Sequence, residues 1–324
     1  MFPPAIMEGL KDLHAVHRPW KDDFYRLTAV RRDTLFTLIK ASRNRLLDEI
    51  FTRIRAVRTG SQPSIQLLTG IYNYFDASDW SLLDMIALAA CAPATEEQIA
   101  SAVAPNALLY HSLRMLDDVL DGHEDYKGGA PTLFGQLRSQ PETRPLAAAG
   151  NLIPAMILAV SVSASLSGED RRLYERTLIG VLHEAFAGDW RTDDGYRRIA
   201  EAKMGAYGMF LYRPAVLLFE PGIREKLEPF LARSFYIAQV VNDLQDRQED
   251  HARQQPNFWL AGRDPDVASA EFMGEITALS RACAEMSPKV RDYAHTRVTD
   301  LIGYCLQVVQ ASDQDWHRRT LQAP

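Results

Sequence analysis

Two acidic clusters, each at the end of an apolar stretch, constrain the fold of this chain most. The first is Asp117-Asp118-Val119-Leu120-Asp121, and the second is Asn242-Asp243-Leu244-Gln245-Asp246, followed by Asp250. In a helix, positions i, i+3 and i+4 share a face, so the carboxylates of each cluster would project together. Stacked carboxylates repel one another unless a cation lies between them, and oxygen-rich sites of this kind suit Mg²⁺. The sequence therefore predicts two helices that each present a divalent-metal site.

Runs of aspartate also occur on solvated helix faces, and the flanking residues decide between the two interpretations. The first cluster follows Leu108-Leu109-Tyr110 and Met115-Leu116, and the second follows Ala238-Gln239-Val240-Val241. Acidic groups beside apolar surface cost free energy unless they are paired. These flanks favour metal sites over solvated faces, and removal of one carboxylate (Asp117→Ala, Asp121→Ala or Asp243→Ala) is expected to leave the fold intact.

Strand signals are nearly absent from the sequence, and helical periodicity is frequent. Helices are expected over about 24–58, 64–75, 82–91 and 96–121, and from about Leu146, Glu169, Tyr196, Gly222, Ser269 and Ser287. Thr95 with Gln98 is expected to form a capping box at the start of the 96–121 helix. The pattern indicates a single all-α domain, with residues 1–60 as an N-terminal helical extension and residues 61–324 as its main body.

The two clusters resemble the paired aspartate-rich motifs of the trans-isoprenyl diphosphate synthase (polyprenyl synthetase) superfamily, which carries Asp-Asp-x-x-Asp on two facing helices. Further similarities follow the order of that family: Gly129-Ala130-Pro131-Thr132, Lys203 followed by Met204, and Gln239 before the second cluster. The resemblance extends from about Leu82 to Leu260. It implies a helical bundle of the isoprenoid synthase type with a central apolar cavity.

The resemblance also implies a site and its ligands. The expected metal ligands are Asp117, Asp118, Asp121, Asn242, Asp243, Asp246 and Asp250, holding up to three Mg²⁺ ions. The expected catalytic residues are Asp117, Asp118, Asp121, Lys203 and Asp243. The expected substrate-binding residues are Lys127, Lys203, Tyr207, Gln239 and Arg247. The implied substrate is an allylic prenyl diphosphate, and the implied assembly is a homodimer.

The departures from the family concern its second substrate, isopentenyl diphosphate. Family members hold that diphosphate with a basic segment about 35 residues before the first motif, and this chain has Asp76-Ala77-Ser78-Asp79-Trp80-Ser81-Leu82 there. Two acids and no base cannot grip a phosphate group by the same contacts. Lys127-Gly128 stands where the family has two arginines. The allylic half of the site is therefore expected to be retained and the acceptor half lost or rebuilt.

Four functions remain open on these residues. The ionised prenyl group could be transferred to another acceptor, could cyclise on its own double bond as in class I terpene cyclases, or could still be elongated through rebuilt contacts. We place transfer or elongation ahead of cyclisation, because Asp246 and Asp250 follow the synthase pattern although Asn242 resembles the cyclase pattern. The fourth function, a non-catalytic regulatory subunit, would not need the intact acidic positions.

The composition indicates the class of protein, its possible partners and its compartment. With 47% hydrophobic and 24% charged residues the chain reads as a globular protein, and a net charge of −6 makes nucleic acid an unsuitable partner. The three cysteines lack metal-ligand spacing and the start of the chain lacks a secretory signal, which favours the cytoplasm. The charge-free run from Pro145 to Gly168 suits a buried helix better than a stable membrane insertion. His111, His123, His183 and His251 show no zinc-binding pattern.

Overall fold

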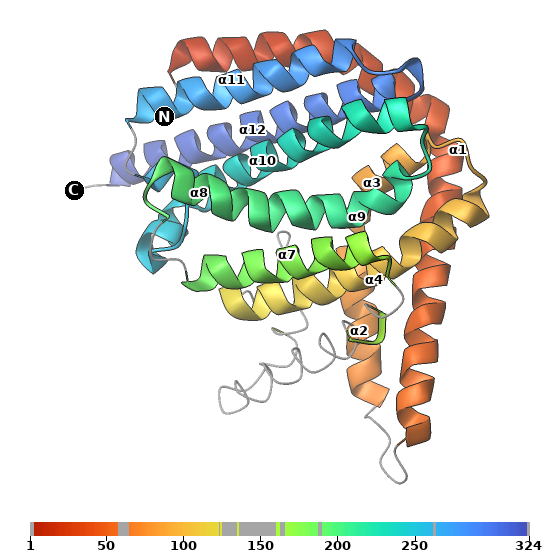
Figure 1. Ribbon diagram of the computed structural model, residues 1–324. Helices are drawn as coiled ribbons and strands as arrows, with labels where there is room; N and C mark the ends of the chain where they lie inside the picture. The colour runs from red at the N-terminus through yellow and green to blue at the C-terminus, as the bar shows by residue number, and fades with distance from the viewer. Residues whose placement is uncertain are drawn as a thin grey trace. The chain divides into compact units, whose positions relative to one another are not determined.

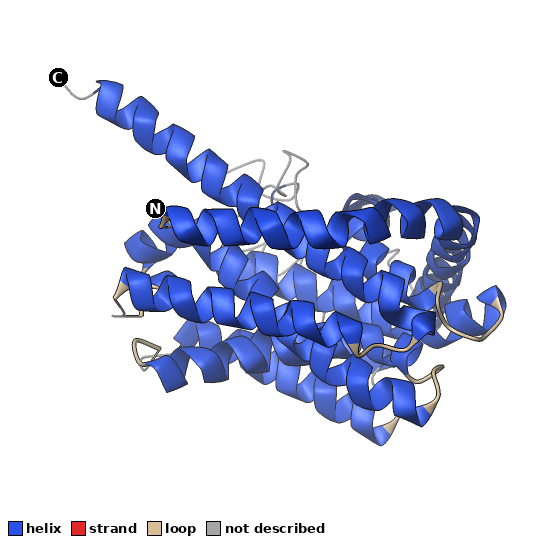
Figure 2. Ribbon diagram, turned by 90° about the horizontal axis from the view of Figure 1, so that it is seen from above, coloured by secondary structure: helices blue, strands red, loops and turns tan. Residues whose placement is uncertain are grey.

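A computed structural model describes residues 3–57, 65–122, 124, 135, 160–162, 166–186, 190–261 and 264–322. Within these ranges every regular element is helical and no strand occurs (Figure 2). The elements are α1 (Pro4–Val57), α2 (Ile65–Ser78), η1 (Asp79–Leu82), α3 (Leu83–Ala89), α4 (Glu96–Asp121), α7 (Gly168–Phe186), α8 (Asp193–Ala200), η3 (Glu201–Gly205), α9 (Ala206–Val216), α10 (Pro221–Arg253), η4 (Phe258–Leu260), α11 (Pro265–Ala284) and α12 (Pro288–Gln322). The expected all-α class is confirmed.

Capping chemistry accounts for both ends of α4 and for the proline at the start of α10. Thr95 and Gln98 form the capping box at the start of α4, as predicted. Gly122 ends that helix in the left-handed region with φ of 67°, where a residue without Cβ is least strained. Pro221 opens α10, and Gln254 ends it with φ of 58°. The first acidic cluster therefore lies in the last two turns of α4, whereas the second begins at Asn242, eleven residues before the end of α10.

The N-terminal helix is longer than the sequence pattern indicated. Helical periodicity was expected from about Phe24, whereas α1 already begins at Pro4 and continues through Pro19. A proline inside a helix removes one hydrogen bond and crowds the preceding turn. Leu10 and His17 before it are both buried, so packing of this first part stabilises the helix across the proline.

The chain forms two compact units. Unit 1 contains residues 1–30, 179–209 and 219–324, and unit 2 contains residues 31–178 and 210–218. In unit 1, α10 packs against α11, α12, η3 and η4, and α11 also packs against α12 (Figure 1). In unit 2, η1 connects α2 and α3 and packs against both. Among the described helices, none combines the length and the apolar character that a membrane crossing requires.

Several sequence expectations fall outside the described residues. They concern Lys127, the Gly129–Thr132 segment and most of the charge-free run from Pro145 to Gly168. The division at residue 60 and the central apolar cavity stay predictions.

One glycine sets how closely α9 approaches α10 within unit 1. A Cβ added at Gly208 would lie 2.5–2.6 Å from three ring atoms of Phe235. Phe235 is itself buried, so its ring has little room to move away. The approach of these two helices therefore depends on the missing side chain.

We expect Gly208→Ala to lower the free energy of unfolding by about 1–3 kcal/mol, because the methyl group overpacks the contact with Phe235. Gly205→Ala is the matched control, since nothing lies within 4 Å of its Cβ position. That change should be neutral or stabilising by up to about 1 kcal/mol, the helix preference of alanine over glycine. Denaturant unfolding of both variants checks this, and equal stability would contradict it.

Candidate functional site

The first acidic cluster ends α4, and its first two carboxylates are buried. Asp117 is 8% exposed and Asp118 is 1% exposed. Arg114 lies one turn earlier, with its Nη1 donating to Asp117 Oδ2 at 3.0 Å and its Nη2 3.8 Å from Asp118 Oδ1. The buried Tyr74 hydroxyl on α2 donates to Asp118 Oδ2 at 2.9 Å. The structure thus fixes the orientation of both carboxylates through Arg114, a neighbour along the helix, and through Tyr74, which no local pattern reveals.

This cluster is electrostatically costly for the helix that carries it. The carbonyl end of a helix bears a partial negative charge, so carboxylates in the last turn are unfavourable there. The last turn of α4 contains no basic residue. Asp121 is the final residue of α4, so three aspartates fall in its last two turns, and Arg114 pairs with the first two of them. A bound cation would offset this repulsion.

The second cluster lies on α10, and its most buried member is bonded to the protein. Asp243 is 3% exposed. Its Oδ1 accepts a hydrogen bond from Gln239 Nε2 at 2.6 Å, and its Oδ2 accepts one from the backbone N–H of Phe258 at 2.7 Å. The expectation that Asp243→Ala leaves the fold intact is therefore revised, because that change would leave the buried Phe258 N–H without this acceptor.

A residue that the sequence analysis missed, Asn257, holds this cluster in place. Asn257 is fully buried, and its Nδ2 lies 2.6 Å from the Asp243 carbonyl oxygen and 2.7 Å from Asp250 Oδ2. Its Oδ1 accepts from the N–H of Trp259, which makes it the N-cap of η4. The signal in the sequence is an asparagine directly after Pro256, at the start of a short helix.

The amide of Asn242 is positioned by a tyrosine from α12. The Tyr304 hydroxyl lies 3.0 Å from Asn242 Oδ1 and 2.5 Å from Gln245 Oε1. Burial raises the pKa of Tyr304 to about 12, and the charge of Asp246 acts in the same direction. Tyr304 therefore keeps its proton near neutral pH and remains a hydrogen-bond donor to the cluster.

Lys203 lies in an unusual turn beside α10. It belongs to the π-helical segment η3, which packs against α10 within unit 1. A Cβ at Gly180 would lie 2.6–2.7 Å from the backbone of Ala202 and Lys203, so α7 approaches this turn closely. π-Helical turns occur frequently at functional sites. The lysine is half-buried, as is Tyr207 one turn later, while Arg247 on α10 is exposed.

Two of the aromatic rings near the second cluster contact cations of the protein itself. The guanidinium of Arg197 lies 4.9 Å from the ring centre of Tyr236, and that of Arg297 lies 5.6 Å from the ring centre of Phe235. One face of each ring is therefore already occupied.

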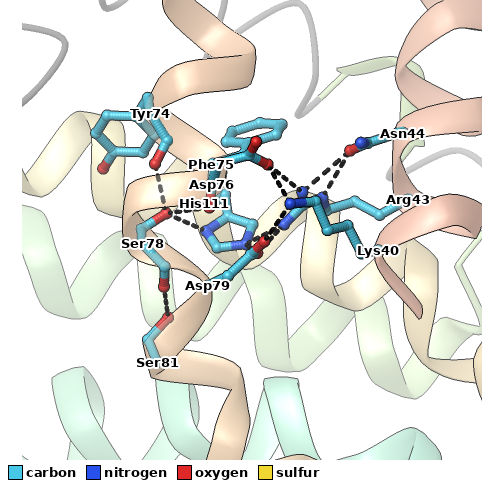
Figure 3. Close-up of polar contacts among 10 residues, drawn as sticks. All are labelled: Lys40, Arg43, Asn44, Tyr74, Phe75, Asp76, Ser78, Asp79, Ser81 and His111. Atoms are coloured by element: carbon cyan, nitrogen blue, oxygen red, sulfur yellow. Dashed lines mark hydrogen bonds and ion pairs between the residues drawn. The ribbon is translucent and has the colours of Figure 1, made fainter. Parts of the chain in front are cut away.

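The segment of residues 76–82, which lacks basic residues in the sequence, sits in a cluster of paired charges in unit 2 (Figure 3). Asp79 is ion-paired with Arg43, which is fully buried, and Asp76 lies 2.9 Å from Lys40 Nζ. Both bases come from α1, 36 residues before their acidic partners. The segment contains no base of its own, as the sequence showed, but the fold supplies two.

Arg43 uses each of its donor nitrogens within this charge cluster. Its Nη1 contacts Asp79 and lies 3.0 Å from His111 Nε2, while its Nε and Nη2 donate to Asn44 Oδ1 at 3.2 and 3.0 Å. The other ring nitrogen of His111 lies 3.0 Å from the Ser78 hydroxyl, which donates onward to the Tyr74 carbonyl at 2.9 Å. The geometry fits a neutral His111 with its proton on Nδ1.

Burial lowers the pKa of His111 to about 4, and the nearby charges of Arg43 and Arg114 act in the same direction against that of Asp79. With His111 neutral, Lys40 and Arg43 balance Asp76 and Asp79. The two acids of this segment are therefore balanced by two bases of α1, and the arginine among those bases is already engaged.

Comparison with known proteins places the fold. The sequence matches no protein-family model, and none of the curated proteins matches it. Among the solved structures, a polyprenyl synthase from Caulobacter crescentus, complexed with calcium and isoprenyl diphosphate, matches with a TM-score of 0.53 and 13% identity. The match covers 85% of this chain and 97% of that chain. The chain therefore has the isoprenoid synthase fold, and the roles of the expected site residues stay predictions.

We expect Asn257→Ala to lower the free energy of unfolding by about 2–4 kcal/mol, because several buried groups lose a partner at once. Asn73→Ala on the exposed part of α2 is the control and should change stability by less than about 0.5 kcal/mol. Thermal and denaturant unfolding measure both. A loss no larger than that of the control would show that Asn257 does not hold the cluster.

The folded protein should lose stability as pH falls from about 6.5 to 4, in part through His111. A depressed folded pKa means that the unfolded chain binds the proton first, so acid favours unfolding. The shift from 6.5 to about 4 corresponds to roughly 3 kcal/mol for this residue. His111→Gln should flatten the pH dependence over this range, whereas His251→Gln on the exposed end of α10 should not. An unchanged slope in His111→Gln would contradict the assignment of a neutral, buried imidazole.

Proposed function

We propose that this protein is an enzyme that ionises an allylic prenyl diphosphate with Mg²⁺ and transfers the prenyl group to an acceptor other than isopentenyl diphosphate. The observation that carries the proposal is the burial of Asp117, Asp118 and Asp243 in two acidic clusters, the first of which lies in the last two turns of α4. Keeping such carboxylates there costs free energy, and a function that needs them explains the cost. The similarity in fold to a polyprenyl synthase supports the same chemistry.

The donor set suits Mg²⁺. It consists of carboxylate and amide oxygens, the hard ligands that this ion prefers, and it contains no sulfur or imidazole. In the proposal Asp117, Asp118 and Asp121 hold metal on α4, and Asn242, Asp243, Asp246 and Asp250 hold it on α10. Bound Mg²⁺ would neutralise the charge that develops on the departing diphosphate.

Side chains of the protein would also help to bind the diphosphate and to orient the metal ligands. Lys203, on the π-helical turn beside α10, would place an ammonium near the diphosphate, with Tyr207 next to it. Gln239 donates to Asp243 and would thereby orient that ligand. Tyr304 would hold the amide oxygen of Asn242 in position. Lys127 and Arg247 remain the proposed further contacts to substrate.

Elongation with isopentenyl diphosphate is disfavoured by the charge cluster around Arg43. A phosphate group is gripped by arginine through several free N–H donors. Arg43 directs its nitrogens to Asp79, His111 and Asn44, and Lys40 is paired with Asp76. This segment therefore has no excess positive charge to offer a second diphosphate.

Cyclisation is the second candidate, and Asn242 favours it. Terpene cyclases carry asparagine at this position of the second motif, and here Tyr304 fixes that amide. A regulatory subunit without activity is less well supported, because it would keep buried acids with no metal to hold. The homodimer and the cytoplasmic setting stay proposals, which sedimentation and fractionation would test.

The decisive measurement is diphosphate release from allylic diphosphates of several chain lengths by the metal-stripped protein, with and without added Mg²⁺. We expect release only with Mg²⁺, and a loss of at least about 100-fold, or about 2.7 kcal/mol in transition-state terms, in Asp117→Asn and Asp246→Asn. Glu225→Gln, an exposed acid on α10, should keep full activity. Metal-independent release, or wild-type rates in both aspartate variants, would refute the proposed function.

Analysis of the products distinguishes elongation of the prenyl group from its transfer to another acceptor and from its cyclisation. With isopentenyl diphosphate present, we expect little or no longer linear diphosphate, because the segment around Arg43 lacks free basic donors. Mass spectrometry would then show either a prenylated acceptor or a cyclic hydrocarbon or alcohol. Efficient formation of linear elongation products would show that other residues, such as Lys127, rebuild the acceptor site.

A further inference from the structure

Three side chains of types that can bind metal ions meet in unit 1, and they come from three helices. None of them belongs to the two acidic clusters. They are His17 on α1, Cys283 on α11 and His295 on α12, and their ligand atoms all lie within 4.8 Å of one another. His17 and Cys283 are buried, and His295 is partly exposed. Nitrogen and sulfur donors brought together in this way form a different chemical environment from the oxygen donors of the aspartates.

The orientation of His17 leaves one particular nitrogen facing this group. Its Nε2 lies 2.7 Å from the Ser280 hydroxyl, and its Nδ1 lies 2.6 Å from Nδ1 of His295. Metal-binding histidines commonly use one ring nitrogen for the metal and anchor the other on an oxygen. The ring of His295 is stacked on Trp20, with centres 4.5 Å apart and planes inclined by 10°. Both imidazoles are therefore held in place by neighbours on the protein.

We propose that His17, Cys283 and His295 bind a zinc-class divalent transition-metal ion, with water completing the coordination. Two imidazole nitrogens and a thiolate are ligands that Zn²⁺ prefers, and Mg²⁺ does not. Nothing in the proposed prenyl chemistry uses this site.

The geometry requires only a modest adjustment. Zn–N bonds of about 2.0–2.1 Å and a Zn–S bond of about 2.3 Å place tetrahedral donors roughly 3.3–3.6 Å apart. The two Nδ1 atoms, now 2.6 Å apart, must separate by about 0.7 Å, and the sulfur must approach by up to about 1.2 Å. Rotation of the three side chains supplies movements of this size.

The alternative is a hydrogen bond between two neutral imidazoles beside an inert thiol. In that case one Nδ1–H donates to the other ring, and Cys283 Sγ only contacts the Leu279 carbonyl at 3.6 Å. The two interpretations differ in what happens to the thiol, because metal binding removes its proton and a hydrogen-bonded pair does not. A bound ion would also join residues that are 278 positions apart in the sequence.

Cobalt(II) titration of the full-length protein, with excess Mg²⁺ present to fill oxygen sites, tests the proposal. We expect about one Co²⁺ per chain and a thiolate-to-cobalt charge-transfer band, both displaced by Zn²⁺. The band should disappear in Cys283→Ser and in His295→Gln. It should persist in Cys305→Ser and Cys91→Ser, which remove the other two cysteines, and in His14→Gln, one turn before His17 on the same helix.

Zinc should also raise the melting temperature of the wild-type protein by roughly 5 °C at a hundredfold excess over its dissociation constant, and not that of His295→Gln. If Cys283→Ser does not fold, His17→Gln and His295→Gln give the same readout. Absence of a charge-transfer band in the wild type would overturn the proposal, and so would its persistence in Cys283→Ser. None of these experiments measures prenyl turnover. A negative result would therefore overturn the zinc site without bearing on the proposed function.

Discussion

The buried guanidinium of Arg43 is the constraint on which unit 2 depends. It is fully enclosed and cannot lose its proton, so the fold must bring acceptors to it. Asp79 at the start of η1 and His111 on α4 meet that requirement, which ties α1 to both elements. Leaving such a charge without its partner costs about 3–5 kcal/mol. The same network reaches Ser78 and the Tyr74 carbonyl, and Tyr74 in turn donates to Asp118, so the position of the first acidic cluster is coupled to Arg43.

The sequence predicts those features that depend on residues close together along the chain. The start of α4 at Thr95, its end near Asp121 and the shared face of the aspartates all follow from contacts over three or four residues. Arg43 and Asp79 are 36 positions apart, and Asp243 meets Phe258 only after the chain has turned through Pro256 and Asn257. No local pattern contains these pairings. The sequence therefore showed only the two acids between Asp76 and Asp79, and not the bases Lys40 and Arg43 that balance them in the fold.

Asp243 shows how one residue can serve the fold and a proposed site together. Its two oxygens accept from Gln239 and from the Phe258 backbone, so it belongs to the packing of η4 on α10. Each oxygen has a second lone pair, which leaves a metal ligand chemically possible. Loss of activity in an Asp243 variant would thus combine two effects. Asp246, which is partly exposed, is the better residue for separating chemistry from stability.

The two proposed metal sites differ in the softness of their donor atoms. Each site therefore prefers a different ion, and the two sites can be loaded and tested separately. Oxygen donors on α4 and α10 suit Mg²⁺, while the histidines and cysteine joining α1, α11 and α12 suit Zn²⁺. A general chelator would remove both ions and confuse loss of turnover with loss of stability. Separate addition of each ion to the stripped protein distinguishes the two, because Mg²⁺ binds thiolate poorly. Recovery of turnover would then follow the hard ion, and thermal stability would follow the soft one.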